Sequence, residues 1–299
     1  GGALPGGVGW YRKHFTLGDC ETQMSQSRFF LEFDGVYMNS TVYVNGQEVG
    51  FRPYGYSSFE YDITPYVREG ENVVAVRVDN SDQPNSRWYS GCGIYRHVWL
   101  TTTNLIHVKH WGVHVETNAK TGQVKVDVDT EGTGHYQVRN TVFDATGKEV
   151  GMKVKKPHLW SVDDPYIYKV RTQLIADGKV VDEVETTTGF RDFKFDPQTG
   201  FWLNGKNFKL NGVCEHHDFG CLGAALNEDA LHRKLSKLKA MGVNSIRSSH
   251  NPPAPELLNM CDTMGLIVMD ESFDMWRRKK TQNDYARFFD EWHERDLSD

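Results

Sequence analysis

The chain contains 299 residues with a net charge of −6, and 38% of them are hydrophobic, which is enough for two or three domains with sizeable cores. It has no basic block, which argues against nucleic acid as a partner, and no apolar run near the roughly 18 residues of a membrane-spanning helix. The five cysteines are scattered without a CxxC pair, so neither a disulfide framework nor a zinc site is expected. The sequence assigns no cellular compartment.

Residues 1–102 predict an all-β domain. Hydrophobic and polar residues alternate in "RFFLEFDGV", "STVYVNGQEVG", "FEYDITPYV" and "NVVAVRVDN", as in strands with one buried face. Asn45-Gly46, within the second of these stretches, is a strong signal for a two-residue hairpin turn. Strands at this spacing, with turn signals between them, predict a jelly-roll β-sandwich.

Residues 103–189 predict a second β-sandwich. The alternation recurs in "HVKHWGVHVET", "GQVKVDVDTEG", "QVRNTVFDATG" and "YIYKVRTQLIADGKVVDEVETTTG". An immunoglobulin-like sandwich of seven strands and about 100 residues fits this pattern. The span is short for that fold, and the stretch with the least room for a further strand is "GKEVGMKVKKPHLW". A strand or loop can therefore be absent from this chain near residues 150–156.

Residues 190–299 predict strands that alternate with helices. Strands are expected at residues 207–213, 243–246 and 266–270. Helices are expected to begin at Asn227, Pro255 and Asp284, and the first two to end at Gly242 and Gly265. Their apolar faces are expected to contain Leu231, Leu235, Leu238 and Met241, then Leu257, Leu258, Cys261 and Met264, then Tyr285, Phe288, Phe289 and Trp292. Either half of a doubly wound sheet or the first units of a (β/α)₈ barrel would give this order.

Polar side chains follow the ends of the three strands, where parallel α/β folds place their functional residues. In chain order they are His216 and His217, then Arg247 and His250, then Asp270 and Glu271. Neighbouring strands lie about 4.8 Å apart, so His216 and His250 could face one bound molecule. Arg247 suits a buried ion pair with Asp270 or Glu271 at least as well as contact with a ligand. Adjacent strand residues point in opposite directions, so Asp270 and Glu271 are not expected to form a catalytic pair.

Eight motifs occur in the chain in the order "GWYRKHF", "VYVNGQEVG", "NSRWYSGCGIYRHVWL", "PHLWSVDDPYIY", "GFRDFKFD", "FWLNGKNFKLNGVCEHHD", "LKAMGVNSIRSSHNPP" and "GLIVMDESFD". With these motifs the chain resembles the β-galactosidase/β-glucuronidase family, glycoside hydrolase family 2, over nearly its whole length. The resemblance implies a multidomain fold. A galactose-binding-like jelly roll would span 1–102, an immunoglobulin-like sandwich 103–189, and the first part of a (β/α)₈ TIM barrel 190–299.

The resemblance also implies a retaining mechanism, in which one glutamate protonates the glycosidic oxygen and a second attacks the anomeric carbon. In this family the acid/base glutamate belongs to an Asn-Glu pair after the fourth barrel strand, and the nucleophile comes later. The only Asn-Glu pair here is Asn227-Glu228, at a predicted helix start. Both catalytic glutamates are therefore expected beyond Asp299, and the chain is expected to be inactive alone.

Several sugar-contacting positions carry over from the resemblance. His216 matches the first-strand histidine that contacts the sugar, and His250 matches the second-strand histidine near the sugar hydroxyls. The segment "NSRWYSGCGIYR" matches the loop that reaches into the barrel mouth. Asn85 or Arg87 stands there where relatives often have an aspartate, and Asp82 is a weaker candidate for a sugar contact.

Other residues at the strand ends are expected to support the site. Arg247, Asp270 and Glu271 would hold the rim rigid around the sugar contacts. Met275 and Arg277 stand where some galactosidases have magnesium ligands. No metal and no cofactor are therefore expected.

The leading hypothesis is a retaining exo-β-glycosidase that hydrolyses terminal β-D-galactosides, with a β-linked oligosaccharide or glycoside as its ligand. A β-glucuronidase or a β-mannosidase of the same family is the nearest alternative. The cationic groups that a glucuronidase needs are expected outside this chain. The alternative from another class is a non-catalytic carbohydrate-binding protein that uses the first sandwich. A homo-oligomer is expected from the architecture of the family.

Overall fold

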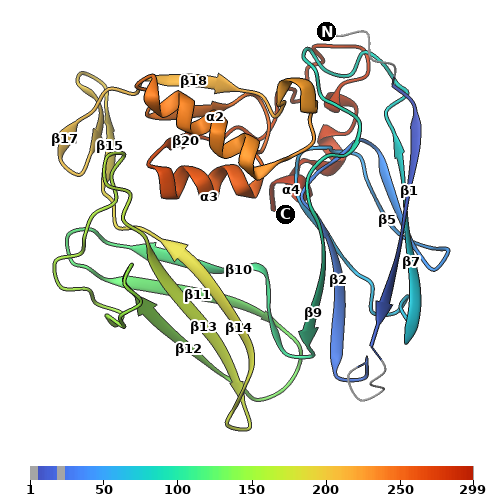
Figure 1. Cartoon of the computed structure of the whole chain (residues 1–299), viewed down its shortest axis with the longest axis horizontal. Coiled ribbons are helices and arrows are strands. Elements are labelled where there is room, and N and C mark those ends of the chain that lie inside the picture. The colour runs from blue at the N-terminus through green and yellow to red at the C-terminus, as the bar shows by residue number, and fades with distance from the viewer. Residues whose placement is uncertain (1–5, 19–23, 299) are drawn as a thin grey trace.

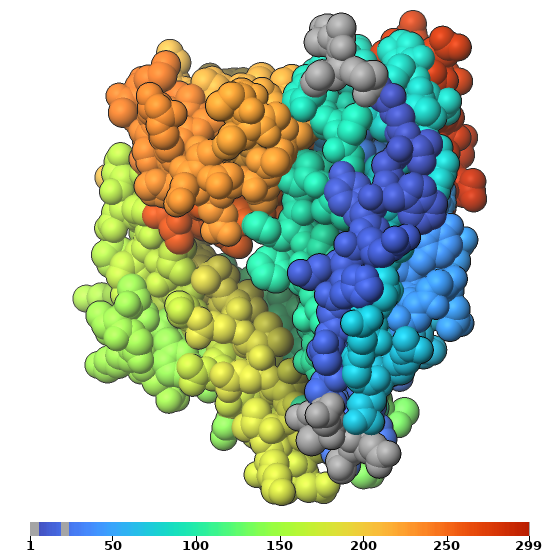
Figure 2. All heavy atoms as spheres, turned by 45° about the vertical axis from the view of Figure 1, so that its right-hand side comes forward, coloured from blue at the N-terminus to red at the C-terminus, as the bar shows by residue number. Residues whose placement is uncertain are grey.

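The computed structural model describes residues 6–18 and 24–298. Three parts lie next to one another in it: two β-sandwiches and a segment in which strands alternate with helices (Figure 1). In the space-filling view the first sandwich, in blue and cyan, lies against the orange α/β segment (Figure 2). This arrangement confirms the predicted fold class. The four cysteines among the described residues are free, and Cys20 lies outside them.

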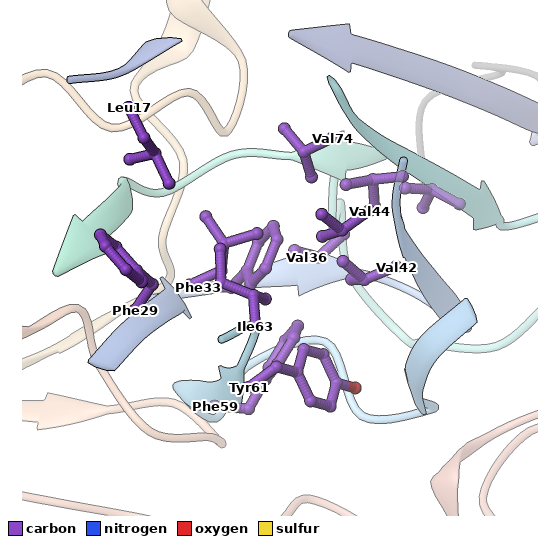
Figure 3. Close-up of a cluster of buried hydrophobic side chains, with 13 residues drawn as sticks. Leu17, Phe29, Phe33, Val36, Val42, Val44, Phe59, Tyr61, Ile63 and Val74 are labelled. Atoms are coloured by element: carbon purple, nitrogen blue, oxygen red, sulfur yellow. The ribbon is translucent and has the colours of Figure 1, made fainter. Parts of the chain in front are cut away.

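The first sandwich contains β1 (Val8–Leu17), β2 (Ser27–Phe33), β3 (Val36–Tyr37), β4 (Ser40–Val44), β5 (Gln47–Arg52), β6 (Phe59–Asp62), β7 (Gly70–Asp79), β8 (Gly93–Ile94) and β9 (Val98–Asn104). Its two main antiparallel sheets have the orders β1-β7-β4-β5 and β6-β2-β9. Phe33, Val42 and Phe59 belong to the buried cluster of this sandwich (Figure 3). Asn45 and Gly46 have φ values of 50° and 82°, which confirms the predicted hairpin turn.

The second sandwich contains β10 (His107–Thr117), β11 (Val124–Glu131), β12 (Gln137–Phe143), β13 (Tyr168–Ala176) and β14 (Lys179–Thr188). The sheet β10-β11 packs with the sheet β12-β13-β14 around a core that includes Val142, Val170 and Phe190. Residues 144–167 connect β12 to β13. Within the described residues this connection forms no strand and pairs with the rest of the sandwich only through isolated β-bridges. The stretch near 150–156, where the sequence is short for a complete immunoglobulin-like domain, lies inside this connection.

The α/β segment begins with an antiparallel hairpin sheet and continues as a parallel sheet. The strands are β15 (Phe193–Asp196), β16 (Gly200–Leu203), β17 (Lys206–Asn207), β18 (Gly212–Glu215), β19 (Ser245–Ser248) and β20 (Ile267–Met269). The parallel order β18-β19-β20 is that of the start of a barrel. The prediction of one strand over 207–213 is wrong, because the Phe208 amide still donates to the Phe201 carbonyl oxygen of the hairpin (2.9 Å).

The helices of this segment are α2 (Glu228–Ala240), α3 (Pro255–Met264) and α4 (Phe289–Ser298). The Asn227 side chain accepts a hydrogen bond from the first turn of α2, and Gly242, with φ 87°, follows its end, as predicted. Leu231 and Leu235 are buried, whereas Met241 is 77% exposed because it lies beyond the last turn. No helix among the described residues is long and apolar enough to cross a membrane.

Two further helix predictions need correction. In α3, Leu258 is 36% exposed, because it lies one position around the helix from Leu257, which packs on the core. The single helix expected from Asp284 is a 3₁₀ turn at Tyr285–Arg287 followed by α4. The Asp284 carboxylate accepts backbone hydrogen bonds from residues on both sides of it, which fixes a turn at this point. The aromatic residues predicted for this face nevertheless pack in one cluster with the first sandwich: Tyr285, Phe288, Phe289 and Trp292.

A buried ion pair joins the first sandwich to α4. Arg52 Nη1, at the end of β5, lies 3.1 Å from Asp296 Oδ1, and both side chains are fully excluded from solvent. The Ser57 hydroxyl donates to the Asp296 carbonyl oxygen (2.8 Å), and the Tyr285 hydroxyl bonds the Asp296 carboxylate. The Tyr285 bond offsets part of the cost of removing the carboxylate from water, and the Ser57 bond fixes the backbone of α4 against the sandwich.

A buried histidine joins the first sandwich to the end of β18. His217 Nε2–H donates to the Ser90 carbonyl oxygen (2.8 Å), and its ring contacts those of Tyr56 and Tyr95 at centroid distances of 5.2 and 5.3 Å. Burial lowers the pKa of His217 to about 4. The imidazole is therefore neutral at pH 7 and serves as part of the contact between the two parts.

Replacing Asp296 by Asn should lower the free energy of unfolding by roughly 3–5 kcal/mol, because the variant removes the buried negative charge that faces the Arg52 guanidinium. Urea unfolding followed by tryptophan fluorescence would measure it. Asp290→Asn is the matched control, since Asp290 lies in the same helix but pairs with Arg277 on the exposed surface. Equal effects of the two substitutions would contradict a role for the buried pair in docking the sandwich.

The free energy of unfolding should also fall as the pH is lowered from about 6.5 to 4, because of His217. In this range the unfolded chain takes up a proton on His217 and the folded chain does not, so acidification favours unfolding by up to about 3 kcal/mol. Unfolding free energies at pH 7 and pH 4.5 should differ less in His217→Gln than in the unsubstituted chain. His232→Gln, on the exposed face of α2, should keep the original difference. An unchanged pH dependence in His217→Gln would rule out the buried neutral imidazole.

Candidate functional site

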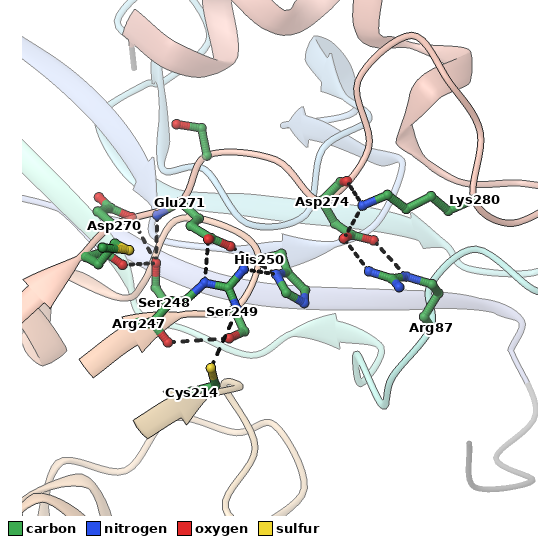
Figure 4. A network of polar contacts seen from close by, with 12 residues as sticks. Arg87, Cys214, Arg247, Ser248, Ser249, His250, Asp270, Glu271, Asp274 and Lys280 are labelled. Atoms are coloured by element: carbon green, nitrogen blue, oxygen red, sulfur yellow. Dashed lines mark hydrogen bonds and ion pairs between the residues drawn. The ribbon is translucent and has the colours of Figure 1, made fainter. Parts of the chain in front are cut away.

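The carboxyl ends of β18, β19 and β20 form one edge of the parallel sheet. The strand register pairs Cys214 with Arg247 and Arg247 with Met269, so the residues that follow each strand emerge next to one another. His216, His250 and Glu271 all lie on this edge, which we call the rim, and Figure 4 shows the last two within its polar network. The candidate site is built on this rim.

The two predicted histidines converge, and an aromatic residue from the first sandwich contacts both. The His216 and His250 ring centroids lie 6.1 Å apart. Trp88 stacks on His216 at 5.1 Å and lies 5.4 Å from His250. His216 Nδ1 is buried without a hydrogen-bond partner among the described residues, which is unusual for a buried polar atom. The rim therefore contains a buried, unsatisfied imidazole nitrogen beside an aromatic surface.

The loop that carries Trp88 is fixed to the barrel segment by a buried arginine. Arg96 donates to the backbone oxygens of Asp34 (3.1 Å) and Tyr56 (2.7 Å) in its own sandwich. It also donates to the Pro252 carbonyl oxygen (2.9 Å), just after the rim residue His250. The Arg96 guanidinium thus fixes the first sandwich relative to the loop after β19.

Arg247, Glu271 and His250 form a network on the rim (Figure 4). Arg247 Nε donates to Glu271 Oε1 (2.6 Å), and His250 Nδ1 lies 2.9 Å from Glu271 Oε2 and 3.0 Å from Arg247 Nη2. Nδ1 cannot donate to the carboxylate and accept from the guanidinium at once, and the carboxylate is the stronger partner, so we assign the proton to Nδ1. His250 Nε2 is then left as an acceptor for a ligand hydroxyl.

The expected ion pair of Arg247 is with Glu271, and it is partly exposed instead of buried. The two side chains are 37% and 25% exposed. Partial burial acts to raise the pKa of Glu271, but the hydrogen bonds from Arg247 and His250 outweigh it and lower that pKa. Glu271 is therefore a fixed negative charge that orients the imidazole.

Asp270 faces away from Glu271, as strand alternation predicts. The Ser248 hydroxyl donates to Asp270 Oδ1 (3.1 Å) and accepts from the Glu271 amide (2.9 Å), which fixes the backbone between the two acids. Burial raises the pKa of Asp270. The two adjacent carboxylates thus have opposite pKa shifts and do not act on one point.

Arg87 makes a two-pronged ion pair across the gap between the first sandwich and the barrel segment. Its Nη2 and Nε lie 2.6 and 3.1 Å from the Asp274 carboxylate oxygens, and Lys280 Nζ lies 2.7 Å from Oδ1. The Asp274 side chain is only 5% exposed, and burial alone would raise its pKa, but the two cations outweigh this and lower it. Arg87 keeps 45% of its side chain exposed beside the rim.

Asn85 and Asp82 have other partners. Asn85 is 3% exposed, accepts from the Tyr37 hydroxyl (2.9 Å), and donates to Asn80 Oδ1 (2.7 Å) and to the Asp82 carbonyl oxygen (2.9 Å). The Asn85 amide group is fully hydrogen-bonded within the protein, so the expectation that Asn85 contacts the ligand is wrong. The Asp82 carboxylate pairs with Arg287 (2.6 Å).

An open cleft of about 910 Å³ lies beside the rim. Its lining includes Arg87, Arg247, His250, Glu271 and Trp276. Trp276 is 64% exposed, and an exposed indole face is a suitable surface for stacking a sugar ring. Sequence reasoning missed Trp88, Asp274 and Trp276. Only Trp88 had a usable signal, because it follows Arg87 in the loop expected at the barrel mouth.

Curated relatives and solved structures match this arrangement. "Beta-galactosidase BoGH2A" from Bacteroides ovatus is 52% identical over all of this chain and 38% of its own length, and a "putative beta-glucuronidase" from Formosa agariphila is 42% identical over all of this chain and 30% of its own length. The crystal structure of a β-glycosidase from Bacteroides vulgatus superimposes with a TM-score of 0.94 at 40% identity, covering 99% of this chain and 40% of that one. The chain thus spans well under half the length of these relatives.

The alignment with the B. ovatus protein runs over 326 positions, more than the 299 residues of this chain, so it contains gaps on this side. Three family models match successive parts of the chain. Residues 5–104 match "Glycosyl hydrolases family 2, sugar binding domain", 101–191 match "Glycosyl hydrolases family 2", and 197–295 match "Glycosyl hydrolases family 2, TIM barrel domain". The fold, the rim and these matches agree, and the chain belongs to glycosyl hydrolase family 2.

Proposed function

We propose that this chain forms the sugar-binding side of a retaining exo-β-glycosidase that acts on terminal β-D-galactosides. The observation that carries the proposal is the convergence of His216, His250 and Trp88 at the ends of neighbouring strands. Imidazole nitrogens can accept or donate hydrogen bonds to hydroxyl groups, and Glu271 fixes the orientation of one of these rings. Family membership and the name of the relative at 52% identity support the galactoside.

The carboxylates of the rim are unsuited to acid/base catalysis. A general acid for glycoside cleavage needs a raised pKa and access to the glycosidic oxygen. Glu271 and Asp274 have lowered pKa values because each is held by cations, and Asp270, whose pKa is raised by burial, has Oδ1 occupied by the Ser248 hydroxyl. We therefore place both catalytic glutamates outside these 299 residues. A homo-oligomer also remains a prediction, which light scattering would test.

A uronide is the second candidate substrate. Arg278 and Lys279 line the cleft together with Arg87, and neither Arg278 nor Lys279 makes an ion pair among the described residues. Cations placed in this way suit a substrate carboxylate. Arg278 and Lys279 belong to this chain, whereas the sequence led us to expect the cationic groups of a glucuronidase outside it. Several relatives are named β-glucuronidases, which supports the same candidate. A β-mannosidase and a non-catalytic carbohydrate-binding protein remain alternatives without a specific observation in their favour.

Saturation-transfer NMR should detect binding of methyl β-D-galactoside to the 299-residue chain. His250→Ala should weaken binding about tenfold, because it removes a hydrogen bond of about 1.4 kcal/mol to a sugar hydroxyl. His232→Ala, on exposed α2, is the control and should leave binding unchanged. Methyl β-D-glucuronide could instead bind more tightly than the galactoside, and substituting both Arg278 and Lys279 by Gln could abolish that preference. This result would make a uronide the proposed substrate in place of a galactoside. Equal binding by His250→Ala and the unsubstituted chain would overturn the site itself.

The 299-residue chain should release no p-nitrophenol from p-nitrophenyl β-D-galactoside above the buffer rate, because cations hold Glu271 and Asp274 in the charged form and the Ser248 hydroxyl occupies Asp270. The B. ovatus relative, assayed in parallel, is the positive control. Turnover by the purified chain that disappears in Glu271→Gln would show that the catalytic carboxylates lie within these residues.

A further inference from the structure

Two glutamates face each other between the first and second sandwiches. Glu32 in β2 and Glu60 in β6 are direct partners in the antiparallel register. Both are half-buried, and the Glu32 side chain is 14% exposed. Like charges directly opposite each other on adjacent strands destabilise a sheet, and burial strengthens their repulsion. A proton or a cation shared by the pair would relieve this repulsion.

A histidine from the second sandwich reaches the same point. His110 Nδ1 in β10 lies 3.5 Å from Glu32 Oε2. The register of β10 with β11 shifts between Val108 and Val113, and Trp111 has a φ of 53° inside this bulge. A β-bulge redirects a side chain, and here it turns the imidazole toward the glutamates. One candidate ligand atom from each of Glu32, Glu60 and His110 lies within 4.8 Å of the other two.

The protein groups nearby do not neutralise both acids. Glu32 Oε1 accepts a hydrogen bond from the Thr101 hydroxyl (2.6 Å). The Glu60 carboxylate has neither a hydrogen bond nor an ion pair among the described residues. A neutral imidazole is the form that binds metal ions.

We propose that Glu32, Glu60 and His110 bind one divalent transition-metal ion of the Zn²⁺ class. One imidazole and two carboxylates, with water in the fourth position, form a three-residue ligand set suited to Zn²⁺. The imidazole and the small number of protein ligands disfavour Ca²⁺ and Mg²⁺, which prefer oxygen ligands. Ligand atoms around tetrahedral Zn²⁺ lie roughly 3.3 Å apart, so small side-chain rotations close the site.

The ion would join the two sandwiches. β2 and β6 belong to the first sandwich and β10 to the second, so one metal ion bonded to all three strands would restrict the angle between them. Sequence reasoning could not find the site, because its ligands come from three strands and have no metal-binding spacing. This position is separate from the rim, and the proposal is independent of the substrate.

The test uses the 299-residue chain after treatment with a chelator. Calorimetric titration with ZnCl₂ should show one tight site, and Zn²⁺ should raise the melting temperature. His110→Gln and Glu60→Gln should each weaken Zn²⁺ binding at least tenfold, since even residues that only support metal ligands contribute this much. His114→Gln, on the same strand and exposed, is the matched control and should bind as the unsubstituted chain does.

Glu60→Gln also separates a metal site from an ordinary structural contact. Without metal it should raise the melting temperature, because it removes the repulsion with Glu32, and it should abolish the rise caused by Zn²⁺. Full Zn²⁺ affinity in His110→Gln, or no Zn²⁺-dependent rise in the unsubstituted chain, would overturn the proposal. An equal response to MgCl₂ would overturn the assignment to the Zn²⁺ class.

Discussion

Arg52 and Asp296 form an ion pair where neither side chain reaches solvent, and burial raises the pKa of Asp296 and lowers that of Arg52. Such a pair is costly unless its geometry is right and further hydrogen bonds satisfy it, and the Tyr285 hydroxyl provides one to the Asp296 carboxylate. The two charges come from the first sandwich and from α4, so the parts can dock in few orientations. The position of Trp88 on the rim depends on this docking, because Trp88 belongs to the sandwich and its ring partners to the barrel segment.

The acids near the rim differ in role because they differ in surroundings. Glu271 and Asp274 are held as anions by arginine, histidine and lysine side chains, and their pKa values fall. Asp270 accepts a hydrogen bond from the Ser248 hydroxyl and has no cation bonded to it among the described residues, so desolvation prevails and its pKa rises. The charged acids fix His250 and Arg87 in place. The rim is thus organised for positioning a ligand, and its chemistry depends on groups that these side chains do not provide.

Local patterns predicted the elements well where the physical signal is local. The Asn45-Gly46 turn, the Asn227 cap and the glycine after α2 depend on a few adjacent residues, and all three are present. Strand alternation likewise predicted that Asp270 and Glu271 diverge. The predicted start of α4 was wrong. The buried Asp284 carboxylate accepts hydrogen bonds from the backbone of the preceding loop, and the helical periodicity of the sequence does not reveal these bonds.

The candidate site could be predicted only in part. His216 and His250 follow successive strands, and that order is enough to bring them together. The ion pair of Arg87 with Asp274 joins residues far apart in the sequence, and no spacing rule predicts it. Asn85 looked available as a sugar contact, but tertiary packing buries it and uses its amide within its own loop.

The three-stranded parallel sheet has consequences for how tightly a sugar would be held. Within the described residues, β18 and β20 are its two edge strands, so the rim covers an arc and not a closed ring. On these 299 residues alone, a pyranose resting on this arc would keep its far face in water and retain much of its hydration there. Its residence time would be short, and fast exchange between free and bound sugar is the regime to expect.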